Sequence, residues 1–193
     1  MKHHVVRHAV GFVLGLALAS QTMAAPVTYM IDESHSFSRF SYNHLGLSTQ
    51  QSRFNKNNGK IVFDAAAQTG SVEVTIDAKS IDTGFAAFNQ HIQGEDFLDT
   101  AKFPTATFKS SKVEFLNDKP AKIFGDLTIK GVTKPVVLEV TSFQATIHPM
   151  RRKDAIGANA FTTIKRSEFN AGKYVPAVSD EVRIDLAIEA LRD

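Results

Sequence analysis

The segment "EVRIDLAIEA", residues 181–190, is the clearest strand of the sequence. Its apolar side chains stand at every second position, and most of the positions between them are charged. The apolar set is Val182, Ile184, Leu186 and Ile188, and the charged set is Arg183, Asp185 and Glu189. A period of two with one apolar face is typical of antiparallel sheets, because strands of parallel sheets are covered on both faces. This segment therefore predicts a half-buried antiparallel strand.

The same alternation recurs along most of the chain. It is strong in residues 71–77 and 135–141, and weaker in residues 27–32, 35–43, 59–64, 105–115, 121–130 and 157–166. Between Phe108 and Val113 the apolar phase slips, which predicts a β-bulge. The segment "IKGVTKP" around Gly131 predicts a short hairpin connection. Eight or nine short strands with regular turns indicate an all-β barrel or sandwich.

One segment breaks the alternation. In "SIDTGFAAFNQHIQG", residues 80–94, the spacing of Phe85, Phe88 and Ile92 predicts one face of a short helix, at about residues 85–93. Asp82 or Thr83 is expected to cap its start, and Gly94 to end it. Its apolar face has two interpretations: it closes the end of a barrel and completes the core, or it forms the lid of a ligand cavity.

Residues 1–24 have the layout of a cleaved secretory signal peptide. Lys2 and Arg7 precede the apolar run "AVGFVLGLALA", and the small residues of "SQTMAA" follow it. The apolar run is shorter than the ~20 residues of a spanning helix, so no stable membrane insertion is expected. We expect an exported protein whose residues 25–193 form a single domain.

The composition of this domain argues against nucleic acid as a partner. The chain has 22 basic and 20 acidic residues, and Lys2 and Arg7 leave with the signal, which makes the remainder neutral. The Arg151, Arg152 and Lys153 cluster is interpreted as a solvated loop. Because the chain contains no Cys, the fold needs no disulfide in an oxidising compartment.

Catalytic motifs are absent from the sequence. It contains no nucleophile elbow, zinc-binding helix, phosphate loop or dinucleotide-binding glycine pattern, so no catalytic residue, metal or cofactor is predicted. Two alternatives stay open. One is a small hydrolase or isomerase that uses His44 or His91 with Asp82, Asp96 or Asp99, and the other is a barrel with a filled core that serves in stress or protein interaction.

Phenylalanine is unusually abundant, with 15 residues in the chain. Phe54, Phe97, Phe103 and Phe169 fall in expected loops or strand edges. Apolar residues at such places either pack a loop on the core or line the portal of a ligand pocket, because such pockets are mostly apolar.

Long blocks of the sequence resemble the YceI family of secreted bacterial proteins. They are "YMIDESHSFSRFSYNHLGLSTQQSRF", "GKIVFD", "SVEVTIDAKSIDTG", "QHIQGEDFLDTAKFPTATFKS", "GDLTIKGVTKPVVLEV" and "SDEVRIDLAIEA". The resemblance runs from about Tyr29 to Ala190. It implies an extended eight-stranded antiparallel β-barrel, similar to lipocalins, that encloses a long isoprenoid or other lipid without covalent attachment. It also implies a periplasmic location, no catalytic residue and, as often in the family, a possible homodimer.

The sequence departs from the family pattern at the expected helix. Relatives commonly carry Asn after "SIDTG" and an Arg-Asp pair before the His, whereas this chain has Phe85, Phe88 and Asn89. An Arg that could hold a pyrophosphate head group is therefore missing. We expect an apolar or smaller-headed ligand, such as an isoprenoid quinone, a carotenoid-like molecule, a fatty acid or a fatty amide.

The sequence thus predicts a periplasmic carrier that sequesters or transports a long apolar lipid. Alternation places Phe40, Tyr42 and His44 on one strand face, where Tyr42 and His44 would contact the ligand head. The predicted ligand-contacting residues are Phe40, Tyr42, His44, Phe54, Phe63, Phe85, Phe88, Ile92, Phe97, Phe103 and Phe108.

Overall fold

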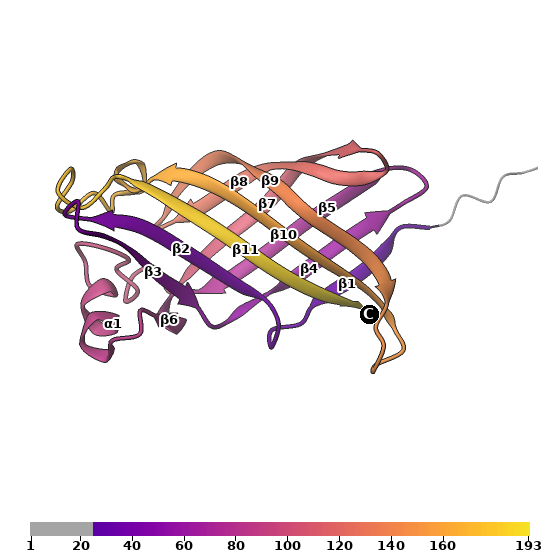
Figure 1. Cartoon of the computed structure of the whole chain (residues 1–193), viewed down its shortest axis with the longest axis horizontal. Helices are drawn as coiled ribbons and strands as arrows, with labels where there is room; N and C mark the ends of the chain where they lie inside the picture. Colours follow the sequence, from indigo (N-terminus) through magenta and orange to yellow (C-terminus); the bar gives the residue numbers. More distant parts are fainter. Residues whose placement is uncertain (1–24) are drawn as a thin grey trace, which may run out of the picture.

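The computed structural model describes residues 25–193, so the expected signal peptide lies outside the described residues. The described chain is built almost entirely from strands (Figure 1). They are β1 (Val27–Ile31), β2 (Phe37–His44), β3 (Ser48–Phe54), β4 (Asn57–Asp64), β5 (Thr69–Asp77), β6 (Ile81–Asp82), β7 (Thr105–Leu116), β8 (Lys119–Ile129), β9 (Val132–Ile147), β10 (Asp154–Lys165) and β11 (Glu181–Arg192). One α-helix, α1 (Ala86–Ile92), and two 3-10 turns, η1 (Ala78–Ser80) and η2 (Arg166–Phe169), complete the set.

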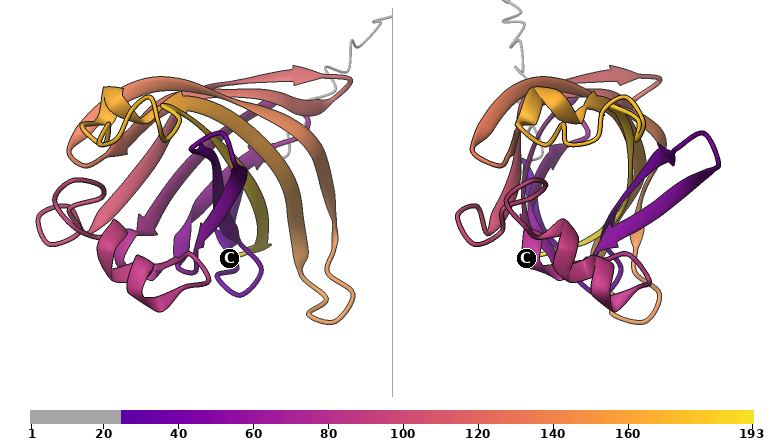
Figure 2. Two further views of the ribbon diagram at one scale, coloured as in Figure 1. Left: turned by 60° about the vertical axis from the view of Figure 1, so that its left-hand side comes forward. Right: turned by 90° about the vertical axis from the view of Figure 1, so that its left-hand side faces the viewer.

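Eight of these strands close into an antiparallel barrel. The order is β1-β4-β5-β7-β8-β9-β10-β11, and β11 pairs with β1 to complete the circuit. Figure 2 (right) looks along this barrel, with α1 and the segment after η2 on opposite sides of the near end. The expected all-β barrel with one short helix is therefore confirmed.

Local sequence explains the long strands on one side of the barrel. Two-residue connections join β7 to β8 at Asn117 and Asp118, and β8 to β9 at Lys130 and Gly131, all with φ between 50° and 74°. Two successive positive φ values are those of a type I′ turn, whose twist matches that of the strands it joins. The expected hairpin at Gly131 is confirmed, and so is the bulge in β7, where the register with β8 shifts between Ser110 and Lys112.

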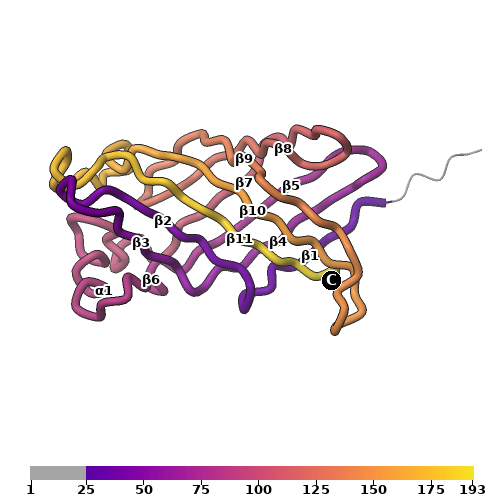
Figure 3. The backbone as a smooth tube through the Cα atoms, in the orientation of Figure 1, coloured from indigo at the N-terminus to yellow at the C-terminus, as the bar shows by residue number. Residues whose placement is uncertain are grey.

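Strand β11 is shared by two parts of the wall. Its first half, Arg183 to Ala187, pairs with β2, and its last residues, Ala190 to Arg192, pair with β1 (Figure 3). Strands β3 and β6 extend the sheet outward from β2. The sequence did not predict β3, because most of its residues are exposed and polar, and the pattern of one apolar face is missing there.

A buried polar cluster joins the two parts of the wall. Asn57 is 0% exposed, accepts a hydrogen bond from Ser38 Oγ at 2.8 Å and donates to the carbonyls of Ser36 and Phe54 at 3.0 Å each. Ser36 Oγ in turn donates to the Glu189 carbonyl of β11 at 3.0 Å. These bonds give side-chain donors to the carbonyls of Ser36, Phe54 and Glu189 where the sheet divides.

The helix α1 lies beside β6 at the end of the barrel that carries the β2–β3 turn (Figure 1). The expected cap was wrong, because the N-cap residue is Phe85, which makes no side-chain capping bond. Asp82 Oδ1 instead accepts from the Gly84 N–H at 2.9 Å, and the Thr83 N–H and hydroxyl both donate to Asn89 Oδ1 at 2.7 Å. The side chain of Asn89, a residue of the helix itself, therefore holds the helix to the preceding loop.

Candidate functional site

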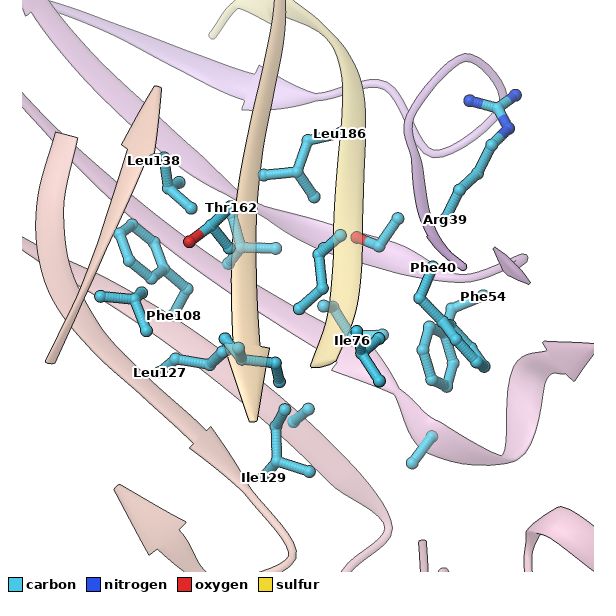
Figure 4. A pocket seen from close by; sticks show the side chains of 18 of the residues that line it. Arg39, Phe40, Phe54, Ile76, Phe108, Leu127, Ile129, Leu138, Thr162 and Leu186 are labelled. Atoms are coloured by element: carbon cyan, nitrogen blue, oxygen red, sulfur yellow. The ribbon is translucent and has the colours of Figure 1, made fainter. Parts of the chain in front are cut away.

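The barrel encloses a cavity of about 230 Å³ near the end that carries α1. The inward residues of β11 lie on its wall together with inward aliphatic residues of the other strands (Figure 4). Many of the aliphatic lining residues stand at alternating positions of their strands. They include Val72, Val74, Ile76, Leu127, Ile129, Val136, Leu138, Ile164, Val182, Ile184 and Leu186. Fourteen apolar residues of the described chain are buried to below a tenth of their area, yet they leave this space unfilled.

Few polar side chains reach the cavity wall. They are Ser38, Arg39, Thr105, Lys130, Thr162 and Arg166. The guanidinium of Arg39 points away from the labelled apolar side chains in Figure 4 and lies 5.5 Å from the ring of Phe37. Lys130 Nζ donates to the carbonyls of Glu95 and Asn170 at 2.6 and 2.7 Å. The charged ends of these two side chains are therefore directed elsewhere than into the apolar interior.

Arg166 holds the segment that follows η2. Its guanidinium donates to the carbonyls of Ala171, Lys173, Val178 and Ser179 at 2.5 to 2.8 Å. Burial lowers the pKa of this guanidinium, and the carboxylate of Asp180 acts in the opposite direction. Because its donors are bonded to backbone, Arg166 fixes a loop at the end of the barrel that carries α1 and contributes its carbon stem to the cavity wall.

The helix and the loop after it form the opposite side of this end. Ile92 is buried at 7% exposure, and it lines the cavity together with Phe97, Leu98 and Phe103. The His91 ring lies 6.0 Å from the Phe88 ring and 5.0 Å from the Phe97 ring. Phe97 in turn lies 6.1 Å from Tyr174, which connects the helix side to the loop held by Arg166.

The structure places the predicted ligand-contacting residues in two groups. Phe40, Phe54, Ile92, Phe97, Phe103 and Phe108 line the cavity. Tyr42, His44, Phe63, Phe85 and Phe88 are outside its lining. The expectation that the apolar helix face lines the cavity therefore holds for Ile92 but is wrong for Phe85 and Phe88.

Local geometry explains the second group. Phe85 precedes the helix and is 67% exposed, and Phe88 packs on His91. Tyr42 and His44 lie near the tip of the β2–β3 hairpin, where His44 bridges to Val178. Burial raises the pKa of the Tyr42 phenol, which packs beside the main core. Phe63 lies toward the other end of the barrel.

Most of the lining was missed by sequence reasoning because it is aliphatic. The alternation in β5, β8, β9 and β11 already marks those residues as inward-facing, so the signal was present. What the sequence could not show was which inward residues meet one another across the barrel and which face empty space.

A second, smaller cavity of about 50 Å³ lies deeper in the barrel. It shares six lining residues with the first: Ile61, Val72, Ile123, Val140, Ala158 and Ile188. Phe63, Phe115 and Phe143 also line it, with the Phe63 ring 6.2 Å from Phe115 and 5.2 Å from Phe143. The two cavities are therefore neighbouring chambers along one apolar interior.

The hydrolase alternative gains no support from the geometry. Among residues 25–193, no hydrogen bond or ion pair joins His44 or His91 to a carboxylate, whereas His35 Nδ1 lies 3.0 Å from Asp32 Oδ2, outside both cavities. In the same part of the chain, no three His, Asp or Glu side chains gather closely enough to hold a metal ion. The filled-core alternative conflicts with the cavity itself.

The longest helix of the described residues, α1, has seven residues, far fewer than the ~20 that a membrane-spanning helix needs.

Comparison with known proteins decides the family. A family model described as a YceI-like domain matches residues 29–190. The chain belongs to the YceI-like family. A UPF0312 protein of Ectopseudomonas mendocina is 39% identical over 184 residues, which cover 93% of this chain and 95% of that protein. A UPF0312 protein of Pseudomonas aeruginosa is 36% identical over 182 residues, which cover 93% of this chain and 94% of that protein.

Three solved structures share the fold. Burkholderia cenocepacia BcnA superposes with a TM-score of 0.70 at 30% identity, covering 83% of this chain and 99% of BcnA. The Campylobacter jejuni YCEI protein gives a TM-score of 0.69 at 29% identity, covering 78% and 90%. A polyisoprenoid binding domain from Saccharophagus degradans gives 0.67 at 17% identity, covering 86% and 99%, which is a likeness of fold.

Proposed function

We propose that this YceI-like protein is a carrier that holds one long apolar lipid chain, of isoprenoid, isoprenoid quinone or fatty type, inside its barrel. The observation that carries the proposal is the open, almost wholly apolar cavity of about 230 Å³. The description of the Saccharophagus degradans relative in fold as a polyisoprenoid binding domain supports the same class of ligand.

The driving force is transfer of hydrocarbon out of water. Each buried methylene contributes roughly 0.8 kcal/mol, and the cavity offers no charged group that would need a polar partner in the middle of the chain. A ligand taken from a membrane gains much less, because it leaves one apolar environment for another. A small difference between barrel and bilayer suits a protein that must also release its lipid.

The polar head is expected at the end of the barrel that carries α1. Lys130 and Arg166 stand there, but their donors are bonded to backbone carbonyls. With Phe85 and Phe88 at two positions that are polar in relatives, and so without the relatives' Arg, we infer a ligand with a small or weakly polar head rather than a pyrophosphate. Binding without catalysis, in the periplasm, completes the proposal.

A cavity-filling substitution tests the proposal. Ala160 lines the cavity on β10, so Ala160→Phe would occupy the space that the lipid needs without introducing a charge. Thr163 is exposed on the same strand, so Thr163→Phe is a matched control. Native mass spectrometry after loading with an isoprenoid quinone, and the shift in unfolding temperature that the quinone causes, are the measurements.

The wild type and Thr163→Phe should retain one quinone per chain and unfold at a higher temperature when loaded. A ligand at 100 times its Kd adds about 2.7 kcal/mol to the free energy of unfolding. Ala160→Phe should fold but lose both effects. The proposal would be contradicted if a folded Ala160→Phe variant retained the quinone. It would also be contradicted if the wild type did not retain it.

A further inference from the structure

The two chambers of the barrel are joined at a ring of small and aliphatic residues. Ala158 on β10 is one of the six residues common to both cavities, and it pairs with Phe143 of β9 on one side and Ile188 of β11 on the other. An alanine at this position leaves an opening that a larger side chain would fill. The ring is therefore a throat between the large chamber and the deep one.

Beyond the throat, three phenyl rings line the deep chamber, and this group of rings is called the floor. Phe63 is buried at 8% exposure and lies within 6.2 Å of both Phe115 and Phe143. Phe115 belongs to the last part of β7, next to the β7–β8 turn, at the end of the barrel opposite α1 (Figure 1). The deep chamber, at about 50 Å³, has room for only one or two groups of the size of a water molecule, about 30 Å³ each.

We propose that the deep chamber is a subsite for the far end of the bound chain, and that the Phe63–Phe115–Phe143 floor sets the longest chain the protein accepts. The proposal rests on the proposed lipid-carrying function. It adds that chain length is selected by the phenyl floor and by the width of the throat at Ala158.

Strand geometry sets the scale of the selected length. The large chamber extends along β8 from Ile129 to Ile123, a separation of six residues. Six residues at ~3.3 Å along a strand tilted by ~40° span roughly 15 Å of barrel axis. An extended chain of carbon–carbon bonds of ~1.5 Å covers this depth with about a dozen carbons. The deep chamber adds one or two more carbons before the floor is reached.

The test is a series of saturated fatty acids of increasing even chain length, each below its micelle concentration, competing with a fluorescent polyene fatty acid. The head group is constant, so differences in affinity report on the chain. Up to the floor, each added methylene should raise affinity roughly fourfold, which corresponds to about 0.8 kcal/mol. At the length that meets the floor, the rise should stop.

The chain length at which affinity stops rising is called the break point. Three variants should move it in defined directions. Phe115→Ala and Phe143→Ala remove half-buried rings from the floor and should shift the break to chains longer by two or more carbons. Ala158→Leu narrows the throat and should shift it to shorter chains. Phe161→Ala is the control, because Phe161 lies on β10 outside both linings, with the Arg183 guanidinium 4.0 Å from its ring centroid.

The outcomes separate this proposal from the one on which it rests. Saturable binding with a break point that none of the folded variants moves would overturn the floor and leave lipid carrying intact. Absence of saturable fatty-acid binding at any chain length would overturn the subsite, and the quinone-loading experiment would then decide lipid carrying separately. A break that moves outward for a floor variant and inward for Ala158→Leu supports the subsite, and using both directions protects the test against one variant that does not fold.

Discussion

Asp32 organises the turn between β1 and β2 through both oxygens of its carboxylate. The Ser34 N–H and hydroxyl donate to Oδ1 at 3.0 and 2.6 Å, and His35 Nδ1 lies 3.0 Å from Oδ2. These hydrogen bonds, first that of the Ser34 hydroxyl and then that of His35, lower the pKa of Asp32 from 3.8 to about 2. The same carboxylate raises the pKa of His35.

The sign of each shift fixes a pH window for stability. Asp32 stabilises the fold above its unfolded pKa of 3.8, and this contribution is lost as the pH falls toward 2. His35 stabilises it below its unfolded pKa of 6.5, and this contribution is lost at higher pH. The pair therefore contributes most between about pH 4 and pH 6.5.

Substitution of Asp32 tests the acid side of this window. Between pH 5 and pH 2, the wild type should lose at most about 2 kcal/mol more unfolding free energy than Asp32→Asn, measured by urea titration at each pH. Glu33→Gln, at the exposed neighbouring position, should keep the wild-type pH dependence. If the unfolding free energies of the wild type and Asp32→Asn changed equally with pH, protonation of Asp32 would not affect the stability of the fold.

At the scale of elements, the sequence predicted those parts whose signal is local. Alternation in β11, the bulge near Ser110 and the hairpin at Gly131 follow from residue spacing and turn chemistry, and all three are present. The strand β3 was missed because it lies outside the closed circuit and buries little apolar surface. The start of α1 was misjudged because Asp82 and Thr83 bond to the loop and to Asn89 instead of capping the helix.

The candidate site was predicted only in part for a related reason. Aromatic residues attract notice in a sequence, but exposure of Phe85 depends on how α1 sits at the barrel end, which no local pattern encodes. Ile129 and Leu138 line the cavity instead, and their strand pattern is the same as that of any core residue. Whether an inward side chain meets a partner or a void is decided by the barrel as a whole.

The β8–β9 hairpin gives an element-scale prediction. Gly131 has φ of +74°, and a Cβ at this position would lie 2.6 Å from Phe103 Cε1, at the cavity wall. Gly46 has φ of +71° and no atom within 4 Å of such a Cβ. Gly131→Ala should therefore lose about 1 kcal/mol more unfolding free energy than Gly46→Ala, because both strain a turn and only the former displaces Phe103.

Urea unfolding of the two variants measures this difference, and the affinity for the fluorescent polyene fatty acid reports on the displaced ring. Gly131→Ala should bind the probe more weakly than Gly46→Ala. Equal stabilities and equal affinities would mean that Phe103 moves freely away from the hairpin.

At the scale of the whole molecule, the division of the wall depends on Asn57. Its amide bonds Ser38 of β2, Phe54 of β3 and Ser36, which directly precedes β2. Strands β2 and β3 form the part of the sheet that leaves the barrel circuit. An apolar residue there would leave buried polar groups without partners, at a cost of about 1–3 kcal/mol for each group.

Asn57→Leu should therefore lower the free energy of unfolding by about 2–5 kcal/mol in a denaturant titration. Asn159→Ala is the control, because Asn159 is exposed and bonds Ser142 on the outer face, and its loss should remain within about 0.5 kcal/mol. If Asn57→Leu lowered the free energy of unfolding no more than the control does, water would be replacing the amide where the sheet divides.

The position of β11 in the chain has a consequence for how the protein is made. This strand holds β10 on one edge and both β1 and β2 on the other, yet it is the last of the barrel strands to leave the ribosome. Until it emerges, β1 and β2 have no partner along that edge, and the cylinder stays open. The barrel and its cavity therefore close only after β11 has been made, and a nascent chain that lacks β11 exposes an unpaired strand edge, which is a site for aggregation.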